Sequence, residues 1–190
     1  MKLESDFLPD IVAGCKRGDR NSQRKLYEQF YGYAMSICLR HTANHEEAVE
    51  VLNDAFFKLF THLDSYNTMQ AFKPWLRRIV VNAAIDYFRK KNRMPSYVDF
   101  TVAAEPTDEA FEIPEILPNE DMLPIVRSLP PVYRTVFNLY VMEDYSHAEI
   151  AEVLGITASS SRSNLARAVE KLRTLLADNR PSQYKTNHQW

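Results

Sequence analysis

The segment 146–173 constrains the fold of this 190-residue chain most, because its local signals specify two helices and the turn between them. Ser146 and Glu149 have the spacing of a capping box, in which the serine hydroxyl caps a backbone amide of the first turn and the glutamate reaches back. The first helix is therefore predicted to begin directly after Ser146. Gly155 can adopt the left-handed conformation that ends a helix, and Thr157 can cap the next one. Two helices joined by so tight a turn form a helix-turn-helix.

The second of these helices carries hydrogen-bond donors suited to nucleic acid. Leu165, Ala168, Leu172 and Leu176 recur at helical spacing and form its inward stripe. Hydroxyl, guanidinium and ammonium groups lie on or near the other side, where they can reach bases and phosphates. The predicted DNA-binding residues of this helix are Ser159, Ser160, Arg162, Ser163, Arg167 and Lys171. A plain two-helix hairpin is the alternative, but it would not need the glycine, the capping threonine and the short hydroxylated residues at the helix start.

A second basic helix is predicted earlier in the chain, over residues 75–93. Apolar side chains recur at three- and four-residue steps and would line one buried face: Leu76, Ile79, Val80, Ala83 and Tyr87. Pro74 suits the first turn. From residue 73 to residue 93, seven basic residues stand against one acid, Asp86, which gives a net charge of +6. Such a face is often only solvated, but two basic helices in one chain favour phosphates as the counter-charge.

The stretch 94–118 separates the two basic helices and has the opposite charge. It contains no lysine or arginine and carries −6 from Asp99, Glu105, Asp108, Glu109, Glu112 and Glu115. Four prolines and little periodicity predict a linker between two helical domains. A passive, solvated tether is the alternative to a segment with a binding role. Because the net charge of the whole chain is only −2, the distribution of charge is more informative than its sum.

The predicted fold class is therefore all-α, with two small helical domains joined by an acidic flexible linker and with the helix-turn-helix in the second domain. The predicted boundaries are 1–93 for the first domain, 94–118 for the linker and 119–177 for the second domain. The polar tail, 178–190, is predicted to be disordered.

Residues 47–60 form a further predicted helix, with more apolar surface than one core-facing stripe needs. Its apolar residues are Val51, Leu52, Ala55, Phe56, Leu59 and Phe60. An exposed remainder would imply a partner, whereas core packing alone would account for about half of the stripe. The segment that follows, 64–72, is polar enough to be a loop and has aromatic rings at its ends, as pockets for unstacked bases require.

The order of these parts resembles the extracytoplasmic-function (ECF) sigma factors, which are initiation factors for bacterial RNA polymerase. Gly18-Asp19 with the segment 26–31 is similar to the family's opening segment, 47–60 to its polymerase-binding helix and 75–93 to its promoter-melting segment. The helix-turn-helix stands where the family reads the minus-thirty-five element, so the resemblance spans roughly residues 6–177. It implies a promoter-specificity factor whose partners are core RNA polymerase, promoter DNA and an anti-sigma factor, in this family often a membrane-bound one.

The resemblance also implies which residues bind. The implied contacts to core polymerase are Glu47, Glu50, Asn53, Asp54 and Phe57, and the implied contacts to minus-ten DNA are Tyr66, Asn67, Trp75, Arg78, Asn82, Arg89, Lys90 and Lys91. Tyr66 and Asn82 would contact a base flipped out of the non-template strand. In the alternative, Tyr66 packs under the loop and Asn82 bonds to the backbone. The linker would thread channels of the polymerase near template and nascent RNA.

The chain departs from the family pattern at several positions. Ser161 stands where an apolar residue is usual in the recognition helix, and Asn164 stands where an arginine is frequent. The apolar burial lost at Ser161 is expected to weaken docking of this helix by about 1 kcal/mol. In the polymerase-binding helix, Asn53 replaces a frequent glutamine and Val49 a frequent acid. These differences bear on the promoter sequence and on hydrogen-bond detail.

Enzymatic and cofactor chemistry is not expected. The four glycines leave no phosphate-cradling loop and no Gly-x-Ser-x-Gly turn, so no catalytic residue, cofactor or small-molecule substrate is predicted. Cys38, His41 and His45 could share a helical face, but a fourth metal ligand is not evident, and no metal site is predicted. Two cysteines, no apolar run long enough for a membrane and no secretory signal predict a reducing cytoplasm. The other histidines, His62, His147 and His188, are expected to be polar surface groups.

Three other protein classes share some of these features. A response regulator would share the helix-turn-helix, but its receiver needs alternating strands and helices, whereas the pattern of residues 1–93 is helical throughout. An interaction protein such as an anti-sigma factor would not need two basic helices around a linker. An RNA-binding protein or nuclease would need a stacking sheet or metal-binding acids. A promoter-specificity factor remains the prediction.

Overall fold

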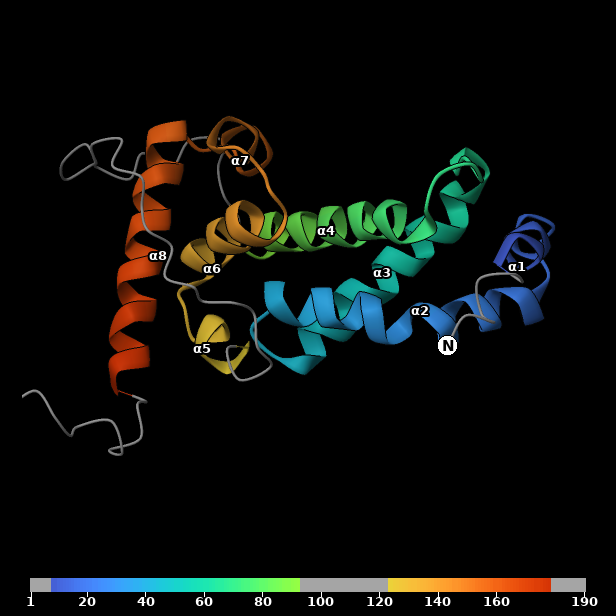
Figure 1. Cartoon of the computed structure of the whole chain (residues 1–190), viewed down its shortest axis with the longest axis horizontal. Coiled ribbons are helices and arrows are strands. Elements are labelled where there is room, and N and C mark those ends of the chain that lie inside the picture. Colours follow the sequence, from blue (N-terminus) through green and yellow to red (C-terminus); the bar gives the residue numbers. More distant parts are fainter. Residues whose placement is uncertain (1–7, 93–122, 179–190) are drawn as a thin grey trace, which may run out of the picture. The chain divides into compact units, whose positions relative to one another are not determined.

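The structure is a computed structural model that describes residues 8–92 and 123–178 (Figure 1). These residues form helices joined by short turns, and no strand occurs among them, which confirms the predicted all-α class. They belong to two compact units, 8–92 and 123–178. The predicted linker and the predicted tail beyond Asp178 lie outside the described residues.

The first unit begins with a helical hairpin. Helix α1 (Leu8–Lys16) leads through a turn into the long helix α2 (Arg20–His41). Gly18 has a φ of 78°, which only glycine adopts without strain. The Asp19 carboxylate accepts hydrogen bonds from the amides of Asn21 and Ser22 and so caps α2. The two helices approach closely, since a Cβ atom on Gly14 would lie 2.1 Å from the Ser22 Oγ.

Helices α3 (His45–His62) and α4 (Phe72–Lys91) pack against α2 and complete this unit, with the 3₁₀ turn η1 (Leu63–Ser65) after α3. The core is formed by apolar side chains from all three long helices, including Leu26, Ile37, Leu52, Leu59, Leu76 and Val80. Helix α4 buries more than the predicted stripe, because Val81, Ala84, Ile85 and Phe88 are also buried. It is therefore a central helix of this unit, with only part of its circumference free for charged residues.

The second unit consists of helices α5 (Leu123–Arg127), α6 (Pro131–Phe137), α7 (His147–Leu154) and α8 (Ala158–Asp178), with the π-helical turn η3 (Asn138–Met142) after α6. Helix α8 packs on α5, α6 and α7. The core of this second unit includes Val136, Phe137, Leu139, Ile150, Leu154, Leu165, Ala168, Val169 and Leu172. The buried Arg134 guanidinium donates from Nη1 to the Arg127 carbonyl oxygen at 2.7 Å, which ties α6 back to α5.

The turn between α7 and α8 has the predicted geometry. The Ser146 hydroxyl accepts from the Glu149 amide and the Glu149 carboxylate accepts from the Ser146 amide, so the capping box is confirmed. Gly155 closes α7 in the left-handed conformation with a φ of 66°. The Thr157 Oγ1 accepts from the Ser160 amide at 3.0 Å and caps α8. These signals were readable in the sequence because each involves residues within three or four positions of one another.

Candidate nucleic-acid and partner interfaces

The outer face of α3 combines acids with one exposed aromatic ring. Phe57 is 71 % exposed, and Glu50, Asn53 and Asp54 are exposed beside it. The sequence predicted that some of the apolar residues of this helix would be exposed here. Most of them are not, since Val51, Leu52, Ala55, Phe56 and Leu59 are buried and Phe60 is half-buried. That expectation was wrong because α2 and α4 cover α3 from two sides. The exposed apolar area comes from Phe57.

Lys58 connects α3 to α4 through two carboxylates. Its Nζ lies 2.8 Å from the Asp54 Oδ2 on α3 and 2.8 Å from the Asp86 Oδ2 on α4. Burial by itself lowers the pKa of the Lys58 ammonium, but its hydrogen bonds to the two carboxylates outweigh that effect and raise the pKa above its ordinary value. Asp54 therefore contributes to an interhelical link as well as to the exposed acidic face.

Glu47 and Lys91, predicted for two different partners, are paired with each other. The Lys91 ammonium of α4 donates to the Glu47 Oε1 at the start of α3. The Glu47 carboxylate also accepts from the Ala43 amide, while the Glu47 amide donates to the Asn44 side chain. Glu47 is thus a capping residue with its carboxylate mostly covered. In the free protein these two predicted contact residues therefore form an ion pair with each other.

The remaining predicted residues of α4 form an exposed polar face. Arg78, Asn82 and Arg89 follow one another at four- and seven-residue steps, which places them along one side of the helix. Their side chains and that of Lys90 are exposed. The face therefore offers guanidinium, amide and ammonium donors together, as contact with phosphates and bases requires.

The loop between η1 and α4 rests on a cluster of aromatic rings. Tyr66 is only 7 % exposed, and its hydroxyl donates to the Gln70 carbonyl oxygen at 2.5 Å. The ring centroids of Phe72 and Trp75 lie 5.2 Å and 4.9 Å from that of Tyr66. Burial also raises the pKa of the Tyr66 hydroxyl. In the free protein the Tyr66 ring therefore packs under the loop, which is the alternative that the sequence left open.

Other side chains of this loop are available at its surface. Asn67 and Met69 are exposed, Met69 to 91 %, and the Asn67 Oδ1 accepts from the Met69 amide at 3.0 Å. Trp75, whose ring packs on Tyr66 and Phe72, is half-buried. Met69 was missed by sequence reasoning, which looked for aromatic rings. The candidate contacts in this region are Asn67, Met69 and the half-buried Trp75.

In the recognition helix α8 the predicted residues divide into two groups. Arg167 and Lys171 are exposed, and Ser159 and Arg162 are half-buried. Ser160 is only 8 % exposed, and its hydroxyl accepts from the Thr157 hydroxyl at 2.9 Å. The Ser163 Oγ is also buried. The Ser160 and Ser163 hydroxyls are therefore covered in the free protein, and the other four predicted residues of α8 are the more accessible ones.

The Ser161 side chain of α8 has a partner on α7. Ser161 has no exposed surface, and its Oγ lies 2.9 Å from the Nδ1 of His147. The His147 ring stacks on Tyr140, with centroids 4.5 Å apart and planes at 18°. Burial, and then the positive charge of Arg162, lower the pKa of His147. His147 is half-buried, so this polar group is held by contacts on one side, and Ser161 has a hydrogen bond where an apolar side chain would have had only packing.

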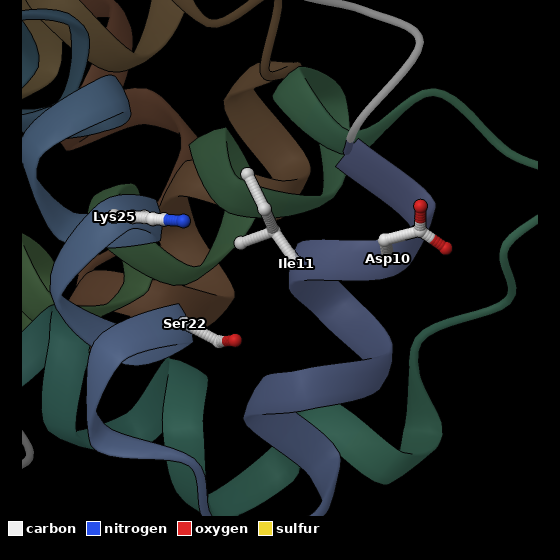
Figure 2. A pocket seen from close by; sticks show the side chains of 4 residues that line it. All are labelled: Asp10, Ile11, Ser22 and Lys25. Atoms are coloured by element: carbon white, nitrogen blue, oxygen red, sulfur yellow. The ribbon is translucent and has the colours of Figure 1, made fainter.

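A shallow pocket of about 220 Å³ opens between α1 and α2, lined by Asp10, Ile11, Ser22 and Lys25 (Figure 2). Figure 2 shows the Ile11 and Lys25 side chains pointing toward one another from the two helices. None of these residues is among the predicted contacts. The pocket lies within the hairpin of the first unit, apart from the α4 face.

Within residues 8–92 and 123–178, no group of three or more histidine, cysteine or acidic side chains is placed to hold a metal ion. Cys38 and His41 are buried, whereas His45 is exposed at the start of α3. Burial raises the pKa of the free Cys38 thiol to about 12 and, together with Asp19, that of the free Cys15 thiol to about 11. No helix in these ranges is long and apolar enough to cross a membrane.

Comparison with known proteins assigns both units to families. The family "Sigma-70 region 2" matches residues 26–94, and the family "Sigma-70, region 4" matches residues 121–172. The chain is 27 % identical over 179 residues to the ECF RNA polymerase sigma factor SigW of Bacillus subtilis, covering 88 % of this chain and 95 % of that protein. It is 26 % identical over 181 residues to the ECF RNA polymerase sigma-E factor of Escherichia coli, covering 88 % and 94 %.

A solved structure of the sigma factor RpoE in complex with the anti-sigma factor NepR from Bartonella quintana is similar with a TM-score of 0.47 and 20 % identity, over 83 % of this chain and 98 % of that chain. A helical unit with an exposed basic helix and a second unit with a helix-turn-helix, matched in this order by regions 2 and 4, define a sigma-70 factor. Within that class, the chain belongs to the ECF sigma factors.

Proposed function

We propose that this protein binds bacterial core RNA polymerase and directs it to a specific set of promoters. The observation that carries the proposal is the presence, in one chain, of a region 2 match over α3 and α4 and a region 4 match over the helix-turn-helix. The protein supplies recognition and strand separation, while the polymerase supplies the chemistry. In this account the chain needs no catalytic residue, cofactor or small-molecule substrate of its own.

The docking surface for the polymerase is the outer face of α3. Phe57 offers an aromatic anchor that is 71 % exposed, and Glu50, Asn53 and Asp54 surround it with carboxylates and an amide. Exposed aromatic residues ringed by polar groups are common anchors of protein interfaces. The complementary surface on the polymerase would present cations around an apolar pocket.

The minus-ten element is read by the loop 66–71 and the exposed face of α4. Once the strands separate, bases can enter the loop region, where Asn67 and the half-buried Trp75 supply a hydrogen-bonding group and a stacking ring. Arg78 and Asn82 lie along the adjoining helix face, and Arg89 and Lys90 neutralise phosphates near its end. Tyr66 acts beneath the loop by fixing its shape.

The minus-thirty-five element is read as duplex by α8. Arg162, Arg167 and Lys171, with Ser159, supply the groups that reach base edges and phosphates in the major groove. In the proposed organisation, domains 1–93 and 119–177 act on separate promoter elements and the acidic segment 94–118 joins them. The proposed site of action is the cytoplasm, with an anti-sigma factor as a restraining partner.

The test is reconstitution of a holoenzyme from the full chain and core polymerase of the source bacterium. Holoenzyme and core alone are incubated with fragmented genomic DNA, and both the bound fragments and the transcripts are sequenced. The expected result is a discrete set of start sites with shared upstream and minus-ten sequences that core alone does not yield. A holoenzyme that forms but initiates without sequence preference would refute promoter specificity, and failure to bind core would refute the docking role.

A further inference from the structure

His147 joins three elements of the second unit through one side chain. It is the first residue of α7, its Nδ1 lies 2.9 Å from the Ser161 Oγ of α8, and its ring stacks on Tyr140 of η3. Figure 1 shows α7 beside the N-terminal end of α8, which is the end that carries Ser161. The contact therefore lies at the junction that orients the recognition helix.

The first turn of α8 has little apolar packing to hold it. Its buried residues, Ser160 and Ser161, are polar, as is Asn164 in the second turn, and the first buried apolar side chain of the helix is Leu165. The Thr157 cap fixes where α8 begins, but a cap does not fix how the helix is rotated about its axis. The buried stripe that begins at Leu165 holds the rest of α8, and the directional hydrogen bond between His147 and Ser161 adds a constraint on the rotation of its start.

Arg162 directly follows Ser161 and is half-buried, and Arg167 lies further along the same helix. Because a helix rotates as a rigid unit, a change in the direction of Ser161 changes the direction of both arginines. Bidentate contacts between arginine and base edges depend on such direction, whereas attraction to phosphates depends on it much less. Rotation of α8 would therefore reduce discrimination between sequences before it reduced general affinity.

We propose that His147 is a positioning residue for promoter reading, which acts through its hydrogen bond to Ser161 to set the rotation of α8 on the upstream duplex. This inference rests on the proposed function, because the duplex is the minus-thirty-five element read by α8. His147 need not touch DNA. Its role is to hold a polar helix start in the one orientation that presents Arg162 and Arg167 to base edges.

The experiment compares three variants in holoenzyme. His147→Phe removes the hydrogen bond and leaves the Ser161 hydroxyl buried without its partner. His147→Asn keeps a polar group near the position of Nδ1, and the double variant His147→Phe with Ser161→Val replaces the polar pair by an apolar one. His62→Phe, at an exposed histidine at the end of α3, is the matched control. Thermal melting of each full chain shows that it is folded at the assay temperature.

The probe is an upstream duplex selected by wild-type holoenzyme from a randomised library, compared with the same duplex after its contacted base pairs are permuted. His147→Phe is expected to lower the ratio of the two affinities about tenfold, equivalent to about 1.4 kcal/mol. His147→Asn and the double variant are expected to retain most of that ratio, and His62→Phe all of it.

The proposal is overturned if folded His147→Phe holoenzyme keeps the wild-type ratio, or if both affinities fall by the same factor, as a purely structural role requires. A double variant that fails to recover the ratio overturns the hydrogen bond as the cause and points to the Tyr140 stack. If wild-type holoenzyme selects no duplex, the proposed function fails instead. In that case the melting temperatures of the free chains still report whether the contact between His147 and Ser161 stabilises the fold.

Discussion

Tyr66 and Ser161 are side chains whose roles depend on contacts between elements. For Tyr66 the sequence allowed a contact with a flipped base or packing under the loop, and for Ser161 it indicated only a loss of apolar burial. The ring of Tyr66 packs against Phe72 and Trp75 and its hydroxyl bonds to the Gln70 backbone. Ser161 bonds to a residue fourteen positions away. The sequence does not show which group a hydroxyl beside an apolar stripe will bond to. The orientations of Tyr66 and Ser161 therefore could not be predicted without knowing how the helices pack.

By contrast, the turn residues of the helix-turn-helix could be predicted from sequence. Ser146 and Glu149 interact within one helical turn, and Gly155 takes a conformation that its missing side chain permits. Such local interactions are specified by spacing alone. Ser160 was harder to place, because its position in the sequence suits either the outer face of α8 or the capping turn. In the structure its hydroxyl lies in the capping turn.

The lowered pKa of His147 makes a prediction for stability. Burial and Arg162 hold the pKa below the ordinary value of 6.5, so the unfolded chain binds the proton first as the pH falls. The contribution of His147 is therefore complete above pH 6.5 and is lost as the pH falls from there through the folded-state pKa, by at most about 1.4 kcal/mol per pH unit. Urea denaturation between about pH 7.5 and about pH 5.5 measures this dependence.

The control for that measurement is His147→Asn, which has no titrating ring at this position. Glu149 and Asp19, whose pKa values are lowered by hydrogen bonds from Ser146 and Ser22, stay ionised across the window and do not contribute. Wild type should lose more stability than the variant as the pH falls. Identical pH dependence in the two proteins would contradict a lowered pKa of His147 in the folded chain.

At the scale of single helices, α3 serves the core with one side and is open to solvent on the other. Its N-terminus is tied to α4 by Glu47 and Lys91, and its middle is tied to α4 by Lys58. The sequence predicted an exposed apolar surface but attributed it to residues that α2 and α4 cover. Amphipathic spacing indicates that a helix has a buried face, but the width of that face depends on how many neighbouring helices pack against it.

The α3 face predicts how polymerase binding can be abolished. Asp54→Arg combined with Phe57→Glu reverses one charge and removes the exposed ring, so binding to core polymerase should fall at least a hundredfold, about 2.7 kcal/mol. Fluorescence titration of labelled protein with core polymerase measures the affinity, and circular dichroism checks that the variant stays helical. Assembly with wild-type affinity would show that α3 is not the docking surface.

Lys58→Met supplies the matched control, because it breaks the same ion pair with Asp54 without altering the exposed groups of the docking face. Pairs as exposed as this one contribute about 0–1 kcal/mol, so the fold should tolerate the change. Lys58→Met should therefore bind core polymerase nearly as wild type does. Equal losses in both variants would indicate that the interhelical link, rather than the docking surface, is responsible.

Helix α4 allows neighbouring lysines to be compared directly. Lys90 and Lys91 are both exposed at its end, but Lys91 is paired with Glu47. Each phosphate neutralised contributes about 0.7 to the logarithmic salt slope on single strands and about 0.9 on duplex. Lys90→Ala should lower the salt slope of promoter binding by about the contribution of one phosphate contact, and Lys91→Ala should lower it by less. Holoenzyme affinities at several salt concentrations give the slopes, and equal slopes for Lys90→Ala and wild type would exclude a phosphate contact.

At the scale of the whole molecule, a net charge of −2 conceals strongly opposed segments. The predicted DNA-binding cations lie on α4 and α8, and each of these helices also carries a stripe of core residues, so their charge is placed by the same periodicity that builds the two units. Order along the chain, helix content and the helix-turn-helix were therefore predictable. Which members of each polar face are covered was not, because neighbouring helices decide it.

The last prediction concerns the separation of duplex reading from strand opening. Arg162→Ala with Arg167→Ala should weaken binding to upstream duplex and relax its selectivity, because these side chains act on paired bases. Opening from an already melted template should remain largely intact. Asn67→Ala with Asn82→Ala should do the reverse, since their partners exist only after the strands separate. These exposed residues replace Tyr66 as the test, because loss of the buried Tyr66 ring would disturb the loop itself.

Permanganate footprinting of holoenzyme on duplex and on pre-melted promoter DNA distinguishes the two effects. The arginine variant should show weak reactivity on duplex and near-normal reactivity on the pre-melted template, while the asparagine variant should bind upstream duplex normally yet protect the melted bases poorly. Each double variant thus serves as the control for the other, because both replace two exposed or half-exposed polar side chains by alanine on a helix or loop that stays folded. If both failed identically on the pre-melted template, one surface would be performing both tasks, and the assignment of reading to α8 and opening to the α4 region would have to be abandoned.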